Sequence, residues 1–263
     1  TNFGYLRKRW KDNTEEERLL GVSLTGIMDN SILSRMRTTL PETLQDMRQK
    51  AVSVNKEWAE KLGIPQSTAI TCVKPSGTVS QLVDSASGIH ARHNPYYIRT
   101  VRGDKKDPLT EFMKDQGIPC EDDVMHPNNA VFSFPMKADS NAVFRDSMTA
   151  IEQLEIWKCY AEHWCEHKPS VTISVKEHEW INVGNWCWDN FDALSGISFL
   201  PFSDHTYQQA PYQDIDKATY EELASKMPEN INWSELSKFE KEDTTKGSQE
   251  LACTAGSCEL VDI

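Results

Sequence analysis

The first stretch that could do chemistry runs from residue 74 to 80, directly after an apolar, β-branched segment. If a strand ends there and a helix starts near Thr78, free backbone N–H groups and the helix dipole would form an anion site. The candidate phosphate-binding residues are Ser76, Gly77, Thr78, Val79 and Ser80, whose three hydroxyls would add donors. An ordinary strand-to-helix loop with a capping hydroxyl is the alternative. The Gly-x4-Gly-Lys spacing of a Walker loop is missing.

The second stretch holds Cys253 and Cys258, near the end of a polar segment. Four residues, including Gly256, separate the two cysteines and would let their sulfurs meet. Two cysteines with no histidine nearby are half a zinc site at best. An exposed pair on a flexible arm suits thiol–disulfide exchange, which needs access and mobility. Two inert tail cysteines are the alternative.

A third cluster surrounds Cys159 and His163, which lie four residues apart on one face of a predicted helix. They could share a metal ion. Trp157, Tyr160 and Trp164 surround them, however, and such a helix must bury one side in any case. Core packing is therefore favoured over a metal site.

Alternating helices and strands must position these residues. Apolar residues at helical spacing predict helices, and β-branched or apolar runs predict strands. Gly63 and Pro65 are expected to end the helix that is predicted at residues 41–62. The alternation favours an α/β fold with a largely parallel sheet. The helices are predicted at residues 41–62, 144–167 and 180–194, and the strands at residues 68–73, 96–101, 130–134, 170–175 and 196–200.

The chain divides by composition into residues 1–228 and a tail, residues 229–263. The tail is acidic and poor in apolar residues, so it is expected to be mobile, with Trp233 and Leu236 as tethers. Within the first part, residues 102–127 are charged and are predicted to be an irregular surface excursion.

Composition excludes several classes of protein. The formal charge of −12, from 28 basic and 40 acidic residues, argues against sequence-independent binding of nucleic acid. No apolar run reaches the length that spans a bilayer, and no secretory signal is visible, so we expect a cytoplasmic protein with seven mostly reduced cysteines. The chain starts at Thr1 within a helix-like stretch, which predicts a piece of a longer polypeptide. A basic patch could still face an anion: Arg92, Arg99, Arg102, Lys105 and Lys106.

Taken together and in order, the motifs resemble those of class II, adenosylcobalamin-dependent ribonucleotide reductases, most closely the monomeric type that reduces ribonucleoside triphosphates. The resemblance covers essentially the whole chain. It is carried by residues 20–26 (LGVSLTG), 74–80 (KPSGTVS), 88–92 (GIHAR), 169–173 (PSVTI), 196–201 (GISFLP) and 247–253 with Cys258.

The resemblance implies that residues 1–228 are the second half of a ten-stranded α/β barrel. It implies adenosylcobalamin as cofactor and a ribonucleoside triphosphate or diphosphate as substrate, with residues 76–80 holding the phosphates. In this family a cysteine thiyl radical takes the 3′ hydrogen of the ribonucleotide, and two further cysteines reduce C2′ while forming a disulfide. Cys253 and Cys258 resemble the tail pair that re-reduces the active-site disulfide and is recharged by a thioredoxin-like partner. The missing N-terminal half would bind the deoxynucleotide effector.

Two departures limit the resemblance. The Asn-Pro-Cys segment that carries the family's radical cysteine is absent, and the reducing pair belongs upstream of Thr1, so the chain alone should be inactive. The family gives no role to the cysteines at 72, 120, 159, 165 and 187. A class I large-subunit fragment is the alternative within the family, but its late Tyr-Tyr pair is missing from residues 198–200. A non-catalytic nucleotide-binding module is the alternative from another class.

Overall fold

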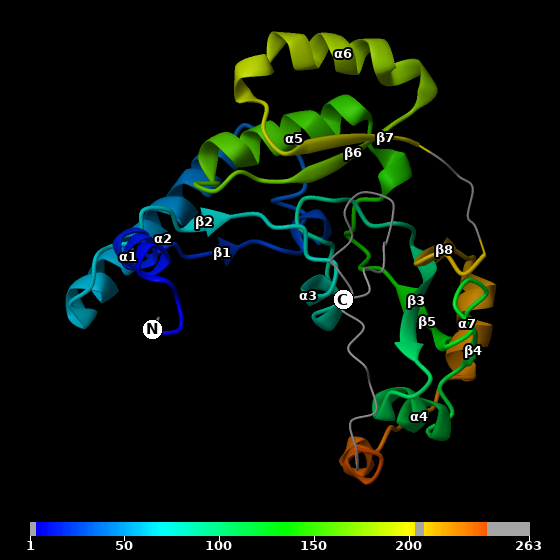
Figure 1. Cartoon of the computed structure of the whole chain (residues 1–263). Helices are drawn as coiled ribbons and strands as arrows, with labels where there is room; N and C mark the ends of the chain where they lie inside the picture. The colour runs from blue at the N-terminus through cyan, green and yellow to red at the C-terminus, as the bar shows by residue number, and fades with distance from the viewer. Residues whose placement is uncertain (1–3, 203–207, 241–263) are drawn as a thin grey trace. The chain divides into compact units, whose positions relative to one another are not determined.

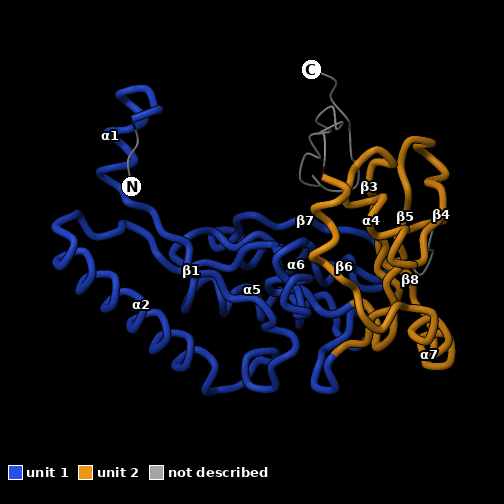
Figure 2. Tube along the Cα trace, turned by 90° about the horizontal axis from the view of Figure 1, so that it is seen from below, with its two compact units in different colours: residues 1–92, 139–203 blue, residues 93–138, 204–263 orange. Residues whose placement is uncertain are grey.

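The computed structural model describes residues 4–202 and 208–240. The chain divides into two compact units (Figure 2): unit 1 is formed by residues 1–92 and 139–203, and unit 2 by residues 93–138 and 204–263. Both are mixed α/β structures, as Figure 1 shows. In the described ranges, no helix is long and apolar enough to cross a membrane.

Unit 1 contains most of the helices. Its α-helices are α1 (Lys8–Glu17), α2 (Leu40–Leu62), α3 (Val79–Leu82), α5 (Ala150–His163) and α6 (Trp180–Asp189). Its 3-10 helices are η1 (Ile27–Asp29), η2 (Arg145–Ser147), η3 (Glu177–Glu179) and η4 (Phe191–Ala193). Its strands are β1 (Val22–Ser23), β2 (Thr71–Cys72), β6 (Val171–Val175) and β7 (Ile197–Pro201).

The strands of unit 1 form two parallel pairs. Val22 of β1 lies opposite Thr71 of β2, and Val171 of β6 lies opposite Ile197 of β7. Parallel pairing agrees with the sequence analysis. In the described residues the two pairs are separate sheets, so closure into a ten-stranded barrel stays a prediction.

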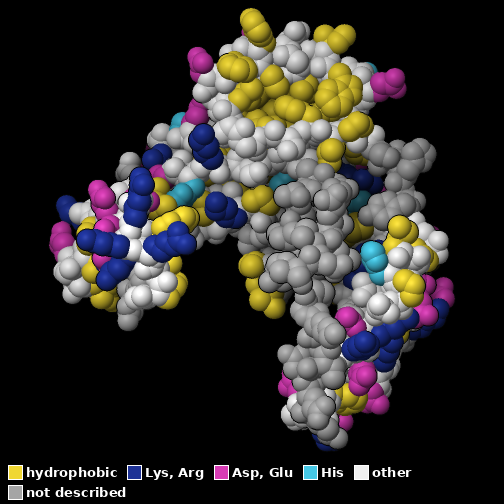
Figure 3. Space-filling view, viewed as in Figure 1, with side chains coloured by type: hydrophobic (Ala, Val, Ile, Leu, Met, Phe, Trp, Pro, Cys, Tyr) yellow, Lys and Arg dark blue, Asp and Glu magenta, His cyan; other side chains and the backbone are white. Residues whose placement is uncertain are grey.

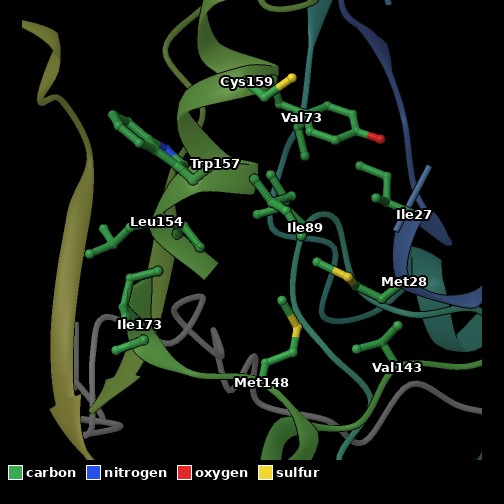
Figure 4. Packing of buried hydrophobic residues seen from close by; sticks show 14 of the residues in the cluster. Ile27, Met28, Val73, Ile89, Val143, Met148, Leu154, Trp157, Cys159 and Ile173 are labelled. Carbon is green, nitrogen blue, oxygen red and sulfur yellow. The ribbon is translucent and has the colours of Figure 1, made fainter. Parts of the chain in front are cut away.

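The core of unit 1 is built around α5 (Figure 4). Leu154 and Trp157 are fully buried, and the Trp157 indole N–H donates to the Pro169 carbonyl at 3.1 Å. Ile27, Ile89 and Ile173 belong to the same cluster. Each fully buried side chain of this size stabilises the fold by about 1.5–3 kcal/mol. Segments 27–28, 89 and 173 are therefore held together mainly by apolar packing.

Helix α2 follows the prediction at both ends. Pro41 lies in its first turn, and Gly63 ends it in the left-handed conformation with φ of 63°. Its apolar stripe is only partly buried, however. Leu44 is inaccessible to solvent, whereas 53% of Trp58 and 63% of Leu62 remain exposed. The C-terminal half of α2 thus leaves much of its apolar surface exposed, although the Lys61 ammonium lies 4.8 Å from the centroid of the Trp58 ring.

Helix α5 starts later than predicted, at Ala150 instead of residue 144. The reason is a capping box. The Thr149 hydroxyl accepts from the Glu152 N–H at 3.1 Å, and the Glu152 carboxylate accepts from the Thr149 N–H at 2.8 Å. These bonds fix the first turn, and the residues before it form the short η2.

Unit 2 is an antiparallel sheet of strand order β4-β5-β3-β8, so the expectation of a largely parallel sheet is wrong for this part. Tyr97 is buried and Tyr96 partly exposed, as alternation along a strand requires. The strands are β3 (Tyr96–Asp104), β4 (Cys120–Asp122), β5 (Asn129–Lys137) and β8 (Tyr212–Asp214), and the helices are α4 (Pro108–Asp115), α7 (Lys217–Ser225) and η5 (Trp233–Lys238).

Residues 102–127 are not irregular, because they contain α4 and β4. The Asp107 carboxylate caps α4 by accepting from the Leu109 N–H at 2.8 Å. Phe112 of this helix is fully buried, and its ring centroid lies 5.4 Å from that of Trp233. The buried ring of Phe112 thus anchors this segment, which had been predicted from its many charges to be an irregular surface excursion.

Candidate functional site

The predicted phosphate loop connects β2 to α3 in unit 1. Thr71 to Val73 are buried, and the chain becomes exposed from Lys74 onward. Helix α3 is only four residues long, so the expected contribution of a helix dipole is lost. Any anion held here would depend on individual N–H and hydroxyl groups.

Ser76 is fixed by three neighbours. Its N–H donates to the Ser87 hydroxyl at 3.0 Å, and its hydroxyl lies 3.0 Å from the Thr25 hydroxyl. Its carbonyl accepts from the Ser80 N–H at 3.2 Å and also from the Ser80 hydroxyl. Ser80 is fully buried. The Ser80 hydroxyl therefore bonds to the Ser76 carbonyl within the loop. The sequence analysis expected this hydroxyl to donate to a bound phosphate, and in the structure it does not face a ligand.

The middle of the loop is open. Gly77, Thr78 and Val79 are exposed, and their backbone N–H groups donate to no described residue. A Cβ added at Gly77 would meet nothing within 4 Å, and Gly77 does not have the positive φ that favours glycine. The backbone thus does not require glycine here. Three adjacent N–H groups and the Thr78 hydroxyl are available to bind an anion.

The loop packs against the segment that starts at Gly88. Gly88 has φ of 51°, and a Cβ there would lie 2.7 Å from the Lys74 carbonyl oxygen. Both the positive φ and this close approach require glycine. The contact places Gly88 directly against Lys74, at the start of the loop.

The sequence suggested that Arg92 could face a bound anion. In the structure, however, Arg92 is only 5% exposed and forms ion pairs within the protein. Its Nε and one terminal nitrogen donate to the two Asp29 carboxylate oxygens, both at 2.9 Å. Another nitrogen donates to the Asp84 carboxylate at 3.2 Å. Asp29 also accepts from the Ala86 N–H at 2.7 Å. The bidentate pair ties η1 to the segment that follows α3.

The cysteine pair predicted to exchange disulfides, Cys253 and Cys258, lies outside the described residues. Burial raises the pKa of the Cys159 thiol to about 11 and that of the Cys165 thiol to about 12. Neither is a thiolate at neutral pH, so neither is an activated nucleophile.

The Cys159–His163 pair does not form a metal site. The His163 Nδ1 lies 2.9 Å from the Gln45 amide nitrogen, and Cys159 belongs to the apolar core. No three His, Cys, Asp or Glu side chains of the described residues come together in a way that could hold a metal ion.

A cavity of about 820 Å³ lies away from the loop, between α2 and the β1–β2 pair. Its lining is almost entirely apolar and includes Leu20, Met47, Val54 and Trp58. Figure 3 shows a second region where apolar side chains gather, at the place where α6 lies in Figure 1. Ile181 and Trp188 of α6 are among the exposed apolar side chains of unit 1. Neither region offers the convergent polar groups of a polar ligand's site.

Sequence reasoning missed Thr25, Asp29 and Ser87. Thr25 is 51 residues from Ser76, and Asp29 is 63 residues from Arg92. No local pattern signals such pairs. The family motif at residues 20–26 includes Thr25, but its contact with the loop appears only in the fold.

Known proteins resemble this chain over nearly its whole length, although no family model matches it. An adenosylcobalamin-dependent ribonucleoside-triphosphate reductase of Euglena gracilis is 30% identical over 259 residues, 95% of this chain and 35% of that protein. The protein of the same name from Lactobacillus leichmannii is 26% identical over 94% of this chain and 37% of its own length. The chain therefore spans about a third of the relatives it matches.

A solved structure has a similar fold. It is a B12-dependent (class II) ribonucleotide reductase, with a TM-score of 0.76, 23% sequence identity, and coverage of 88% of this chain and 36% of that one.

Proposed function

We propose, on the premise that this chain is homologous to part of the adenosylcobalamin-dependent ribonucleoside-triphosphate reductases, that it holds the substrate phosphates in such an enzyme. The observation that carries the proposal is the open loop at Gly77, Thr78 and Val79, whose three N–H groups have no described acceptor. The complete protein would convert ribonucleotides, as triphosphates or diphosphates, to deoxyribonucleotides.

The geometry of the loop supports an anionic ligand. Ser76 forms hydrogen bonds with Ser80, Thr25 and Ser87, so the loop is held without the ligand. Adjacent backbone N–H groups form an anion-binding concavity, and hydrogen bonds to a charged phosphate are worth about 1.5–3 kcal/mol each. Lys74 is exposed at the start of the loop and would add positive charge.

The apolar cavity beside α2 does not fit adenosylcobalamin. A corrin carries many amide side chains that need hydrogen-bond partners, whereas the cavity beside α2 has an apolar lining with few polar residues, such as Lys50 and Asn55. We therefore propose the cofactor for the complete protein and give no residue of this chain a role toward it. The radical cysteine, the reducing cysteine pair and the effector site are likewise proposed for an N-terminal half, without which this chain is inactive.

Cys253 and Cys258 are proposed as the pair that re-reduces the active-site disulfide. One tail thiolate attacks that disulfide, releases one active-site thiolate and forms a mixed disulfide with the other active-site sulfur. The second tail thiolate then attacks the first tail sulfur and displaces the remaining active-site thiolate, which leaves the tail oxidised and the active site reduced. A thioredoxin-like dithiol partner would then reduce the tail.

Substitution of Gly77 tests the loop in the protein reconstituted with its N-terminal half. Gly77→Val places a branched side chain in the open space where the phosphates would lie. It should raise the dissociation constant for a ribonucleoside triphosphate by at least about tenfold, because about one charge-assisted hydrogen bond is lost. Equilibrium binding of a labelled nucleotide measures the change.

Gly184→Val is the matched control, because Gly184 of α6 is exposed and its Cβ would also meet nothing within 4 Å. This substitution should leave the dissociation constant unchanged. Equal affinity of Gly77→Val and the unmodified protein would place the phosphates elsewhere.

A further inference from the structure

The imidazole of His90 connects two segments of unit 1 that are far apart in sequence. Its Nδ1 lies 3.2 Å from the Ser87 carbonyl oxygen, and its Nε2 lies 3.0 Å from the Thr172 backbone nitrogen. Thr172 belongs to β6, whose neighbour Val171 directs its own N–H toward β7, to the Gly196 carbonyl. The Thr172 N–H therefore points to the other edge of β6, where His90 meets it.

These two contacts determine which nitrogen carries the proton. A backbone N–H can only donate, so Nε2 must present its lone pair to Thr172. A carbonyl can only accept, so Nδ1 must carry the hydrogen that it donates to Ser87. Burial lowers the pKa of His90, which agrees with a neutral ring, while the bond to Ser87 opposes this shift. His90 is thus a neutral imidazole with a donor on one side and an acceptor on the other.

Ser87 carries this connection to the phosphate loop. Its hydroxyl accepts from the Ser76 N–H at 3.0 Å, and Ser76 in turn accepts from Ser80 across the loop. A continuous series of hydrogen bonds thus runs from the backbone of β6 through His90 and Ser87 to Ser76.

We infer that His90 is a positioning residue for the phosphate loop: it fixes Ser87 against strand β6 and thereby sets the place of Ser76. The inference deepens the proposed function and rests on it. His90 acts through Ser87 and is not placed in contact with the ligand. Without these two side-chain hydrogen bonds, the Thr172 N–H would lose its partner and the Ser87 carbonyl would keep only the His90 backbone N–H, at 2.9 Å. The segment that holds Ser87 would then lose its side-chain connection to β6.

If His90 only filled space, the affinity of the loop would depend on the volume of its side chain and not on its hydrogen bonds. Two substitutions distinguish this role from positioning. His90→Phe keeps a ring of similar size but removes both polar contacts. His90→Gln keeps an amide oxygen that can accept from Thr172 in place of Nε2. A space-filling role predicts that Phe is tolerated better than Gln, and a positioning role predicts the reverse.

Binding of inorganic triphosphate to the full chain tests the inference. The amide resonances of residues 77–79 are followed by NMR as the probe is added. We expect His90→Phe to weaken binding by about tenfold, as when one or two hydrogen bonds are lost, and His90→Gln to stay within about threefold of the unmodified chain. The control is His178→Phe, since His178 is exposed and forms no described hydrogen bond, and it should change nothing.

Equal affinity of the two His90 variants and the unmodified chain would overturn the inference and leave the proposed function standing. If the amide resonances of residues 77–79 in the unmodified chain do not shift, the proposal that this loop binds phosphates is wrong. The inference about His90, which rests on it, is then wrong as well. The ¹⁵N shifts of the His90 ring provide a test that needs no variant. We expect the hydrogen on Nδ1, and a hydrogen on Nε2 would overturn the inference.

Discussion

Asp29 is the ion-pair partner of a buried guanidinium in unit 1. Its two carboxylate oxygens accept from Arg92, which is 5% exposed, and one of them also accepts from the Ala86 N–H. A buried guanidinium that loses its carboxylate leaves an uncompensated charge, which costs far more than the pair contributes when intact.

We therefore expect Asp29→Ala to lower the free energy of unfolding by about 3–5 kcal/mol. The Asp84 carboxylate, which also accepts from Arg92 but is more exposed, should replace only part of the loss. Urea unfolding followed by circular dichroism measures the change. Asp12→Ala, at an exposed position of α1, is the control and should shift the free energy by less than about 0.5 kcal/mol. A similar small shift for Asp29→Ala would show that the pair is dispensable.

At the same scale, sequence reasoning predicted a loop directly after the strand that ends at residue 73, and the structure has an exposed loop there, but the predicted roles of its hydroxyls differ from those in the fold. The sequence analysis treated Ser76, Thr78 and Ser80 as equivalent donors, whereas the fold uses Ser80 to close the loop and leaves Thr78 exposed. Composition and spacing cannot distinguish a hydroxyl bonded within the loop from one turned outward. That difference depends on where Ser87 and Thr25 come to lie.

Among the elements, α5 has the best-defined start. Thr149→Ala removes the hydroxyl that accepts from the Glu152 N–H and should lower the free energy of unfolding by about 1 kcal/mol. Thr149→Ser keeps the hydroxyl and should cost much less. Thermal unfolding of the three proteins at pH 7 makes the comparison, and equal losses for Ala and Ser would mean that the hydroxyl does not matter.

The same capping box predicts a pH dependence. The hydrogen bonds from Thr149 hold the pKa of Glu152 below its ordinary value. Because the folded pKa is lowered, the carboxylate stabilises the fold above its unfolded pKa of about 4.3 and loses this effect as pH falls through the folded pKa. The difference between Thr149→Ala and the unmodified chain should therefore be smaller at pH 3 than at pH 7.

The elements themselves were mostly predictable, since helical spacing and β-branched runs located α2, α5, β3 and β6. Two kinds of feature were not. Strand direction in unit 2 depends on which strands pair, and β3 pairs with β5 and β8, partners far along the chain. The exposure of Trp58 could not be predicted either. Apolar residues at helical spacing indicate that a helix has an apolar face, but they do not indicate which residues cover that face.

For the molecule as a whole, the proposed roles of Cys253 and Cys258 make a kinetic prediction. In the reconstituted protein, Cys253→Ser or Cys258→Ser should leave the first turnover nearly intact and abolish repeated turnover driven by a thioredoxin-like reductant. Neither sulfur is proposed to act on the nucleotide, but the exchange needs both. Deoxynucleotide formation measured in a single turnover reports the first turnover, and its steady-state rate reports repeated turnover.

A small dithiol that can reach the active site should restore repeated turnover in both variants. Cys120→Ser is the control, because Cys120 is an exposed free cysteine with no proposed role. Full turnover of both tail variants with the thioredoxin-like reductant would remove the tail from the reductive cycle.

The division of unit 1 into two sequence segments has a consequence for the order in which the protein can fold during synthesis. Ile27, Met28, Leu40 and Leu44 belong to a core centred on α5, which the ribosome makes only after all of residues 93–138. Until Leu154 and Trp157 emerge, these apolar side chains have only the partners within the first segment, such as Val73 and Ile89. At synthesis rates of about 5–20 residues per second, the first segment stays exposed for several seconds, the interval in which chaperones act on nascent chains.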